Sequence, residues 1–244
     1  MTPIRVYCAD LDRLCAKVCF SVLDEAEKRR AAGVSDRSAR QEFVKTRALL
    51  RLLLSKHTGQ PVSSLRFATG ASGKPVLLGS HGVHFNVSHS DGTALIAIAS
   101  AEVGIDIECI DGSVDYPGVA ESVFSRSEIE MLRNAPETRR GEVFFSIWTR
   151  KEAYLKATGA GFSSDLPKIS TASSHCVIED LGYATGRRPD WHAFDLPAPA
   201  NFKAALVTTA KDCKIEFVNV AHMTHKPVRD ATPAAAGACA FSSA

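Results

Sequence analysis

The 244-residue sequence lacks long apolar runs and a strong charge of one sign. Its longest uncharged apolar run, near residues 93–101, is far shorter than the roughly 20 residues that a membrane helix needs. The net charge is +2, from 29 Lys and Arg against 27 Asp and Glu, so the chain as a whole is not a polycation that coats nucleic acid. We therefore expect neither a membrane protein nor a nucleic-acid-binding protein.

Paired cysteines and a secretion signal are also missing. The 7 cysteines are an odd number, and none forms the Cys-x-x-Cys pair of a zinc or redox motif. Near the N-terminus, Arg5, Asp10 and Lys17 interrupt the apolar residues, so there is no unbroken apolar stretch of the kind that directs export. We expect buried, reduced thiols and a cytoplasmic protein.

The hydrophobic pattern predicts helices and strands that do not alternate regularly. Apolar residues at helical spacing predict helices over about 22–32, 38–56, 128–133 and 142–158. Expected strands lie over residues 4–7, 65–68, 76–78, 83–88, 94–100, 103–109, 177–179, 191–196, 204–208 and 215–220. This order favours an α+β fold over a doubly wound parallel sheet.

Each half of the chain holds one long predicted helix and several strands, which hints at an internal duplication. Asp111-Gly112-Ser113 is typical of a linker. We therefore expect one unit over residues 1–112 and a second over 113–221. The remaining residues, 222–244, are rich in Ala, Ser, Pro and Gly, which predicts a disordered tail.

A pair of carboxylates lies on the predicted strand at 103–109. Side chains alternate along a strand, so Asp106 and Glu108 share one face, while Ile105 and Ile107 share the other. Two carboxylates about 7 Å apart can share one hard cation through oxygen ligands. The alternative is a solvated face of an edge strand, because an Asp-x-Glu pair is expected by chance about once in this composition.

A third acid lies on the predicted helix at 142–158. Glu152 and Lys156 are four residues apart and share a face, with Trp148 one turn earlier. As an exposed ion pair they would stabilise the helix by only a few tenths of a kcal/mol. If Glu152 joins the strand carboxylates, the three acids suit Mg²⁺ together with substrate phosphates, which Lys156 would face as a point charge.

The segment at residues 85–90 places Ser88 and Ser90 on one strand face and His89 on the other. Reading His89, Ser90 and Asp91 as a hydrolytic triad is poor, because triads assemble in space and not from consecutive residues. His89 is either a structural histidine or a functional one at the end of a strand, next to a turn.

Two further motifs carry no prediction. Residues 70–75 lack the first glycine of a phosphate-binding P-loop and have Pro75 where Ser or Thr would hold Mg²⁺. His222 and His225 border the expected tail, without partner ligands nearby in the sequence.

Taken in order, these motifs resemble the Sfp-type 4′-phosphopantetheinyl transferases. The resemblance rests on residues 85–90, 104–108 and 148–156, the last followed by Gly159 and Gly161. The turn Gly73-Lys74-Pro75 and the Arg-rich N-terminal helices fit as well. The similarity spans roughly residues 20–165, and the chain length suits the fused two-lobe form of the family.

This resemblance implies a fold and an activity. The fold would be two α+β lobes related by pseudo-twofold symmetry, with coenzyme A between them in a monomer. The enzyme would move phosphopantetheine from coenzyme A to a serine of an apo acyl or peptidyl carrier protein and release adenosine 3′,5′-bisphosphate. Mg²⁺ would be required, although Mn²⁺ accepts the same oxygen ligands.

The resemblance also implies roles for the acids and the lysine described above. Asp106, Glu108 and Glu152 would hold the Mg²⁺ ion. Glu152 would in addition accept the serine proton, and Lys156 would stabilise the leaving phosphate.

Besides Lys156, four residues are implied to bind coenzyme A. Ser88 and His89 would contact its phosphates, Lys74 would line the nucleotide pocket, and Arg47 would meet the 3′-phosphate. Carrier proteins of this kind are usually acidic around their serine, so a basic patch at residues 28–30 or 139–140 would suit docking, although a solvated basic face explains either cluster equally.

Two other functions remain open from the sequence. A metal-dependent phosphohydrolase would use the same carboxylates on a nucleotide, but it would not require the full set of motifs. A non-catalytic protein that binds carriers would need no crowding of three acids.

Overall fold

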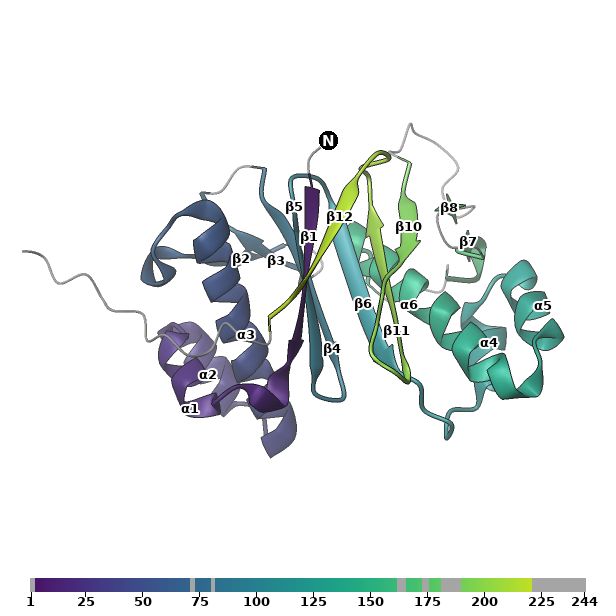
Figure 1. Ribbon diagram of the computed structural model, residues 1–244, viewed down its shortest axis with the longest axis horizontal. Helices are drawn as coiled ribbons and strands as arrows, with labels where there is room; N and C mark the ends of the chain where they lie inside the picture. Colours follow the sequence, from purple (N-terminus) through teal and green to yellow (C-terminus); the bar gives the residue numbers. More distant parts are fainter. Residues whose placement is uncertain are drawn as a thin grey trace, which may run out of the picture.

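The computed structural model describes residues 3–70, 73–79, 82–161, 166–172, 176–180 and 190–220. Two four-stranded sheets occupy the centre of the molecule, and helices flank them on both outer sides (Figure 1). The fold is therefore mixed, with helices and sheets, as the sequence predicts. Within the described ranges, no helix is both long enough and apolar enough to cross a bilayer. The expected tail at 222–244 lies outside the described residues.

The first sheet has the strand order β12-β1-β5-β4. Strands β1 (Pro3–Asp10), β5 (Thr93–Ala99) and β4 (His84–Ser90) pair antiparallel, and β12 (Lys214–Asn219) pairs with β1 in parallel. The turn between β4 and β5 has positive φ at both Asp91 (43°) and Gly92 (72°). Positive φ at both central residues is typical of a tight hairpin turn, which ends β4 at Ser90.

The second sheet has the order β6-β11-β10-β8 and is antiparallel throughout. Its strands are β6 (Val103–Cys109), β11 (Phe202–Thr208), β10 (His192–Asp195) and β8 (Cys176–Val177). Two short ribbons, β2 (Phe67–Thr69) with β3 (Pro75–Leu77) and β7 (Ile169–Ser170) with β9 (Glu179–Asp180), lie outside the sheets. Strand β6 precedes the expected boundary at residue 112 but pairs with β11 in the second sheet. Strand β12 follows that boundary but pairs with β1 in the first sheet.

Three helices lie on the outer side of the first sheet: α1 (Ala16–Val22), α2 (Glu25–Ala32) and α3 (Arg37–Thr58). The helix predicted over 22–32 is confirmed as α2, although it begins three residues later, at Glu25, because Asp24 is its N-cap. Helix α1 was not predicted. The Asp24 carboxylate accepts the backbone N–H of Glu27, and the Glu27 side chain accepts that of Asp24, which is a capping box. Helix α3 agrees with the prediction and ends at Gly59 in a left-handed conformation.

The second sheet is covered by α4 (Tyr116–Val123), α5 (Arg126–Asn134) and α6 (Arg140–Thr158). Helix α4 was not predicted, although Asp115 as its N-cap and Pro117 in its first turn are helix-start features. Helix α6 agrees with the predicted helix at 142–158 and ends at Gly159. The described ranges also contain four 3₁₀ turns: Leu11–Arg13, Val62–Ser64, Glu137–Arg139 and Leu166–Lys168.

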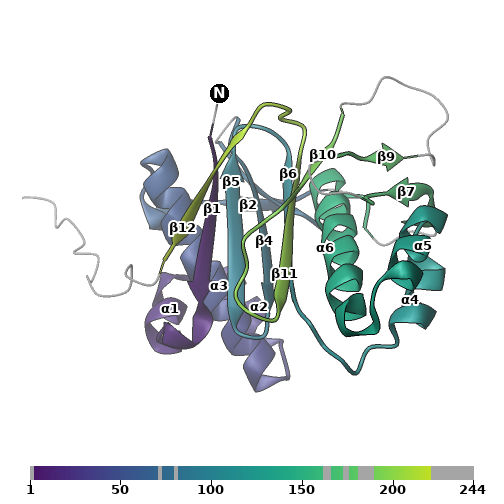
Figure 2. The ribbon, with the colours of Figure 1, turned by 45° about the vertical axis from the view of Figure 1, so that its right-hand side comes forward.

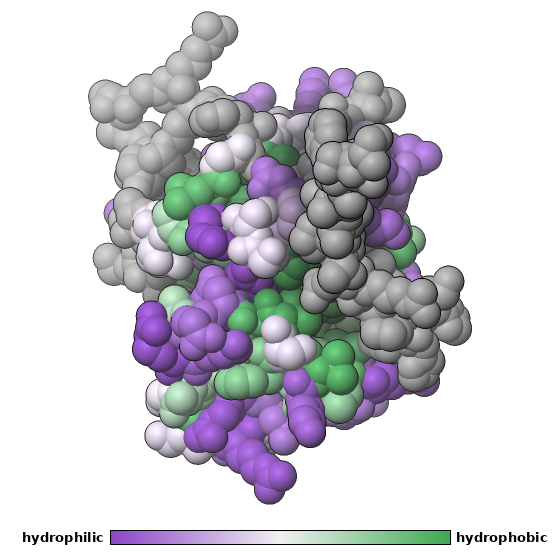
Figure 3. Space-filling view, turned by 90° about the vertical axis from the view of Figure 1, so that its left-hand side faces the viewer, coloured by the Kyte–Doolittle hydropathy of each residue, from purple (hydrophilic) through white to green (hydrophobic). Residues whose placement is uncertain are grey.

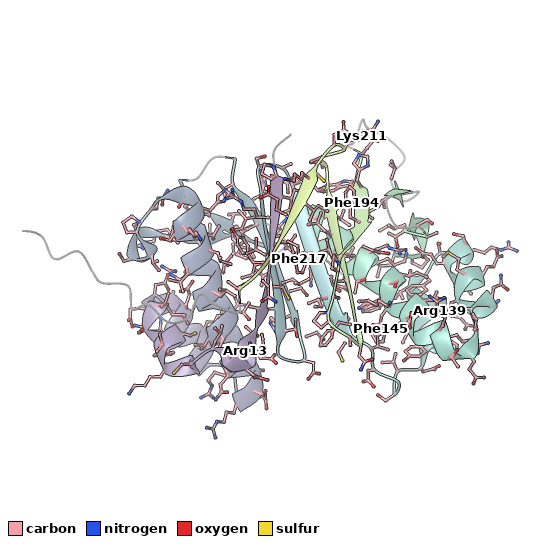
Figure 4. All side chains as sticks on the ribbon, in the orientation of Figure 1. Arg13, Arg139, Phe145, Phe194, Lys211 and Phe217 are labelled. Atoms are coloured by element: carbon pink, nitrogen blue, oxygen red, sulfur yellow. The ribbon has the colours of Figure 1, made fainter. Side chains whose placement is uncertain are left out.

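The core is layered as helix, sheet, sheet and helix (Figure 2). Ile4, Val6 and Leu95 from the first sheet pack against Ile105 and Leu206 from the second. Separate apolar clusters join the first sheet to α3 and the second sheet to α6, and side chains fill the space between the layers (Figure 4). The two sheets are therefore held together by a shared apolar interior.

The surface on the α1 and α2 side is mixed. Hydrophobic patches lie among hydrophilic residues on this face (Figure 3), and Val18 and Phe20 of α1 are exposed. Lys28 and Arg30, from the basic cluster at 28–30, lie over the rings of Phe20 and Phe43. Two of the three basic side chains in this cluster therefore make cation–π contacts with aromatic rings of the neighbouring helices.

Candidate active site

Polar side chains of β4 connect the two sheets along one line. Strands β4 and β6 contact each other, although they belong to different sheets. The Asn86 side-chain oxygen accepts the backbone N–H of Ile105 (2.9 Å), and the Ser90 hydroxyl accepts that of Cys109 (3.2 Å). Every second residue of β4 therefore faces β6, as strand alternation requires.

Asp106 lies at the middle of this line and is 1% exposed. Its Oδ1 accepts hydrogen bonds from the Ser88 hydroxyl (2.8 Å) and from Lys156 Nζ of helix α6 (2.5 Å). Lys156 Nζ also donates to the Ser88 oxygen at 2.9 Å. Strand β4, strand β6 and helix α6 thus meet at the Asp106 carboxylate. Ile105 and Ile107 are buried in the apolar core between the sheets, which confirms the prediction that Asp106 points away from them.

Glu108 and Glu152 lie near Asp106. The Ser90 hydroxyl donates to Glu108 Oε2 at 3.0 Å. Burial raises the pKa of Glu108, and the negative charge of Asp106 adds to the rise. Burial likewise raises the pKa of Glu152, again with a contribution from Asp106, while Lys156 opposes it. The strand carboxylates and the helix carboxylate therefore form one electrostatic cluster.

This cluster has more acid than base. The positive charge of Lys156 interacts with all three acids, Asp106, Glu108 and Glu152. When the three acids are ionised, this one positive charge leaves two negative charges uncompensated. The second oxygen of Asp106, Oδ2, is buried and has no hydrogen-bond partner among the described residues. In the same ranges, however, no three acid, His or Cys side chains are close enough to form a ready-made metal cage.

Helix α6 can approach β6 closely because residue 104 is glycine. A Cβ at this position would lie 2.0 Å from the carbonyl oxygen of Ala153 and 2.4 Å from the backbone nitrogen of Ala157. Both contacts are with helix backbone, so any larger residue would push α6 away from the strand. Gly104 therefore sets the separation between Asp106 and the helix that carries Glu152.

Lys74 comes from the turn before β3 and connects several elements. Its Nζ donates to the carbonyl oxygens of Val103 (3.0 Å) and Ala157 (3.1 Å) and is 3.8 Å from Glu102. Burial lowers its pKa, an effect that Glu102 opposes. Lys74 also lines a cavity of about 410 Å³ between the β3–β4 region and the end of α6, together with Pro75, Phe85 and Thr158.

The remaining predicted residues lie toward the helices of the first half. His89 is exposed, and its Nδ1 is 3.4 Å from Glu42 of α3. Arg47 is mostly buried, forms an ion pair with Glu27 and stacks over the ring of Phe67 at 3.9 Å from the centroid. The structure thus brings together Ser88, Asp106, Glu108, Glu152 and Lys156, whereas no described contact links Arg47 or His89 to that group.

The sequence analysis missed a buried ion pair next to this site. Lys151 Nζ is 2.9 Å from Glu128 of α5, and both side chains are almost fully buried. Glu128 also accepts the backbone N–H of Ser125 (2.7 Å) and of Thr171 (2.6 Å). The capping-box pattern Ser125-x-x-Glu128 could have located the start of α5, but not the contact with Lys151.

Comparisons with known proteins identify relatives over much of the chain. The model of the 4′-phosphopantetheinyl transferase superfamily matches residues 102–207. The chain is 34% identical over 171 residues to the 4′-phosphopantetheinyl transferase HetI of Nostoc sp., covering 68% of this chain and 70% of that protein. Identity to the 4′-phosphopantetheinyl transferase psf-1 of Bacillus pumilus is 38%, covering 59% of each chain. Identity to the 4′-phosphopantetheinyl transferase AcpT of Escherichia coli (strain K12) is 35%, covering 59% of this chain and 74% of that protein.

Proposed function

Because this chain belongs to the 4′-phosphopantetheinyl transferase superfamily, we propose that it transfers 4′-phosphopantetheine from coenzyme A to a serine of an apo acyl or peptidyl carrier protein. The reaction would be Mg²⁺-dependent and would release adenosine 3′,5′-bisphosphate. The observation that carries this proposal is the convergence of Asp106 and Glu108 on β6 with Glu152 and Lys156 on α6. A cluster of acids with one lysine suits a diphosphate and a divalent cation.

Proton transfer and charge stabilisation are assigned to α6. The serine oxygen attacks the β-phosphorus of coenzyme A, and the bond from this phosphorus to the bridging oxygen breaks. Glu152 accepts the serine proton, directly or through water, since its raised pKa makes it a better base than an ordinary carboxylate. Lys156 stabilises the negative charge that develops on the leaving phosphate.

The acid cluster fits a divalent cation. Its two uncompensated charges and the unpartnered Oδ2 of Asp106 are what a hard cation would satisfy. Asp106, Glu108 and Glu152 would hold Mg²⁺, or Mn²⁺, after small movements of their side chains. When bound, the ion would neutralise charge on the diphosphate.

Coenzyme A is assigned to the region between β4 and α6. The cavity lined by Lys74 would take part of the nucleotide, and Ser88 and His89 would contact phosphates at the end of β4. Arg47 would bind the 3′-phosphate with a guanidinium group that already forms an ion pair with Glu27.

The transfer is tested by incubating the protein with coenzyme A, MgCl₂ and several apo carrier proteins, and weighing each carrier by mass spectrometry. We expect a gain of one phosphopantetheine mass. Glu152→Gln should reduce the rate by at least roughly 100-fold, since general-base catalysis typically contributes that much. Glu130→Gln, an exposed acid on α5, is the matched control and should behave as wild type.

Failure to modify any carrier would contradict the transferase proposal. Steady release of nucleotide from coenzyme A without an acceptor would favour the phosphohydrolase instead. Tight binding of apo and holo carriers without turnover would favour a binding protein.

The arrangement in two lobes, the monomeric state and the cytoplasmic location are also part of the proposal. Two lobes, residues 1–112 and 113–221, would be related by pseudo-twofold symmetry, and the enzyme would act as a cytoplasmic monomer. The mass in solution, measured by light scattering, tests the monomer.

A further inference from the structure

The line of polar side chains on β4 is not explained by substrate binding alone. Asn86, Ser88 and Ser90 all face β6, and each makes a contact with a different residue there. Only Ser88 also contacts the proposed catalytic lysine. The roles of Asn86 and Ser90 therefore need a separate explanation.

Ser90 joins two functions in one hydroxyl. The hydroxyl oxygen accepts a hydrogen bond from the backbone N–H of Cys109 at 3.2 Å, and the same hydroxyl donates a hydrogen bond to Glu108 Oε2 at 3.0 Å. One donor and one acceptor therefore fix both the backbone of β6 and the orientation of its outermost carboxylate. Without Ser90, Glu108 would keep its hydrogen bond with the Trp148 side chain but would lose the contact that ties its carboxylate to β4.

Asn86 fixes the other end of the same strand. It is 8% exposed, and its side-chain oxygen accepts the N–H of Ile105, the residue before Asp106. The contacts at Ile105 and Cys109 are four residues apart and bracket both acids. Sliding β6 by one residue against β4 would break both contacts and turn the acids away from α6.

We propose that Asn86 and Ser90 are positioning residues that lock β6 in register beside β4 and aim Asp106 and Glu108 at a shared divalent cation. This inference rests on the proposed function, because it assumes that the acids bind a metal. Ser90 acts on the metal through Glu108, and Asn86 acts through the backbone next to Asp106. Neither residue needs to touch substrate.

The decisive experiment compares Ser90→Ala, which removes the hydroxyl, with Ser90→Thr, which keeps it. Mn²⁺ is the probe, and its dissociation constant is measured by electron paramagnetic resonance in the presence of coenzyme A. We expect Ser90→Ala to weaken Mn²⁺ binding roughly 10- to 100-fold, the usual effect of removing a partner of a metal ligand. Ser90→Thr should bind Mn²⁺ within about threefold of wild type.

A second measurement reports on the strand itself. Amide hydrogen exchange at Cys109 should accelerate in Ser90→Ala but not in Ser90→Thr, because only the former loses the acceptor for that N–H. Asn86→Ala should accelerate exchange at Ile105. Ser122→Ala is the matched control, since this serine is exposed on α4 and bonds only its own helix; it should change neither exchange nor Mn²⁺ affinity.

Kinetics separate positioning from catalysis. In Ser90→Ala the metal concentration for half-maximal rate should rise, while the rate at saturating metal falls less than about threefold. Unchanged Mn²⁺ affinity in Ser90→Ala, with normal binding by wild type, would overturn this inference and leave the transferase proposal standing. Wild-type protein that binds no Mn²⁺ would overturn the metal site and this inference together.

Discussion

The two halves of the molecule each join a short helix to a long one through a buried glutamate. In the first half, Glu27 of α2 contacts Arg51 of α3 at 3.0 Å. In the second half, Glu128 of α5 contacts Lys151 of α6 at 2.9 Å. Both glutamates are the third residue of their helix and close a capping box with its N-cap residue. Each long-helix cation also donates to two backbone carbonyls that follow its helix: those of Val62 and Leu65 for Arg51, and those of Leu166 and Ile169 for Lys151.

The difference lies in how the charge is shared. Glu27 interacts with two arginines, since Arg47 also contacts it, and Arg51 in addition reaches the partly exposed Asp24. Among the described residues, Glu128 has one cation, Lys151. Burial lowers the pKa of Lys151, and the charge of Glu128 opposes this effect. The first network is therefore redundant and the second is not. The second is also adjacent to Glu152, so the helix that carries the proposed base depends on a single lysine.

The largest effect should follow from removing that lysine. Lys151→Met leaves Glu128 buried without a cation, and we expect the free energy of unfolding to fall by about 3–5 kcal/mol. Urea unfolding followed by circular dichroism measures this loss. The double variant Lys151→Met/Glu128→Gln should recover part of the stability, because the uncompensated charge is gone. A loss below about 1 kcal/mol would mean that the pair behaves like a surface salt bridge.

A smaller effect is expected at the corresponding arginine. Arg51→Met removes hydrogen bonds to a charged group but leaves Glu27 paired with Arg47, so the loss should be about 2 kcal/mol. The same unfolding experiment compares the two variants directly. If Arg51→Met is as destabilising as Lys151→Met, the second arginine gives no redundancy.

The smallest effect is a difference in pH dependence. In the first network, burial disfavours ionisation of Asp24, but the Glu27 backbone hydrogen bond and the charge of Arg51 outweigh it and lower its pKa. In the acid cluster, burial raises the pKa of Glu152 above its ordinary value of 4.5. Well below pH 4.5 Glu152 is protonated in both states. Between pH 4.5 and the higher folded pKa, the unfolded state releases the proton while the folded state still holds it, so stability falls until the folded pKa has been passed.

We therefore expect wild-type protein, without divalent metal, to lose stability relative to Glu152→Gln as pH rises from 4.5 toward neutrality. Urea unfolding at several pH values in EDTA tests this. Added Mg²⁺ should reduce the difference, because a bound cation favours the ionised carboxylate. A difference that is constant with pH would show that Glu152 ionises normally in the fold.

Local pattern was enough to predict the faces of β4 and β6 and the length of α6. Alternation placed Ser88 with Ser90 and Asp106 with Glu108, and the glycine after Thr158 marked the end of α6. These features depend on periods of 2 and 3.6 residues and need no knowledge of distant contacts. Helices α1 and α4 were missed: α1 has no side-chain cap, whereas the Asp115 cap of α4 is readable locally.

The contacts between distant segments could not be predicted in this way. The ion pair between Arg47 and Glu27 joins two helices through side chains, and Lys74 bonds to carbonyls of β6 and α6. No local pattern specifies such partners, because each depends on how complete layers pack. The resemblance to a family supplied roles for these residues, but not their partners in the structure.

The parallel pairing of β12 with β1 has a consequence for synthesis on the ribosome. Strand β1 is made before every other element that the structure describes, yet its outer neighbour, β12, begins at Lys214. While the elements between β1 and β12 are made, the nascent chain must carry that edge unpaired, where it is open to aggregation or to chaperones. The first sheet can thus be completed only after almost all of the described chain has been made.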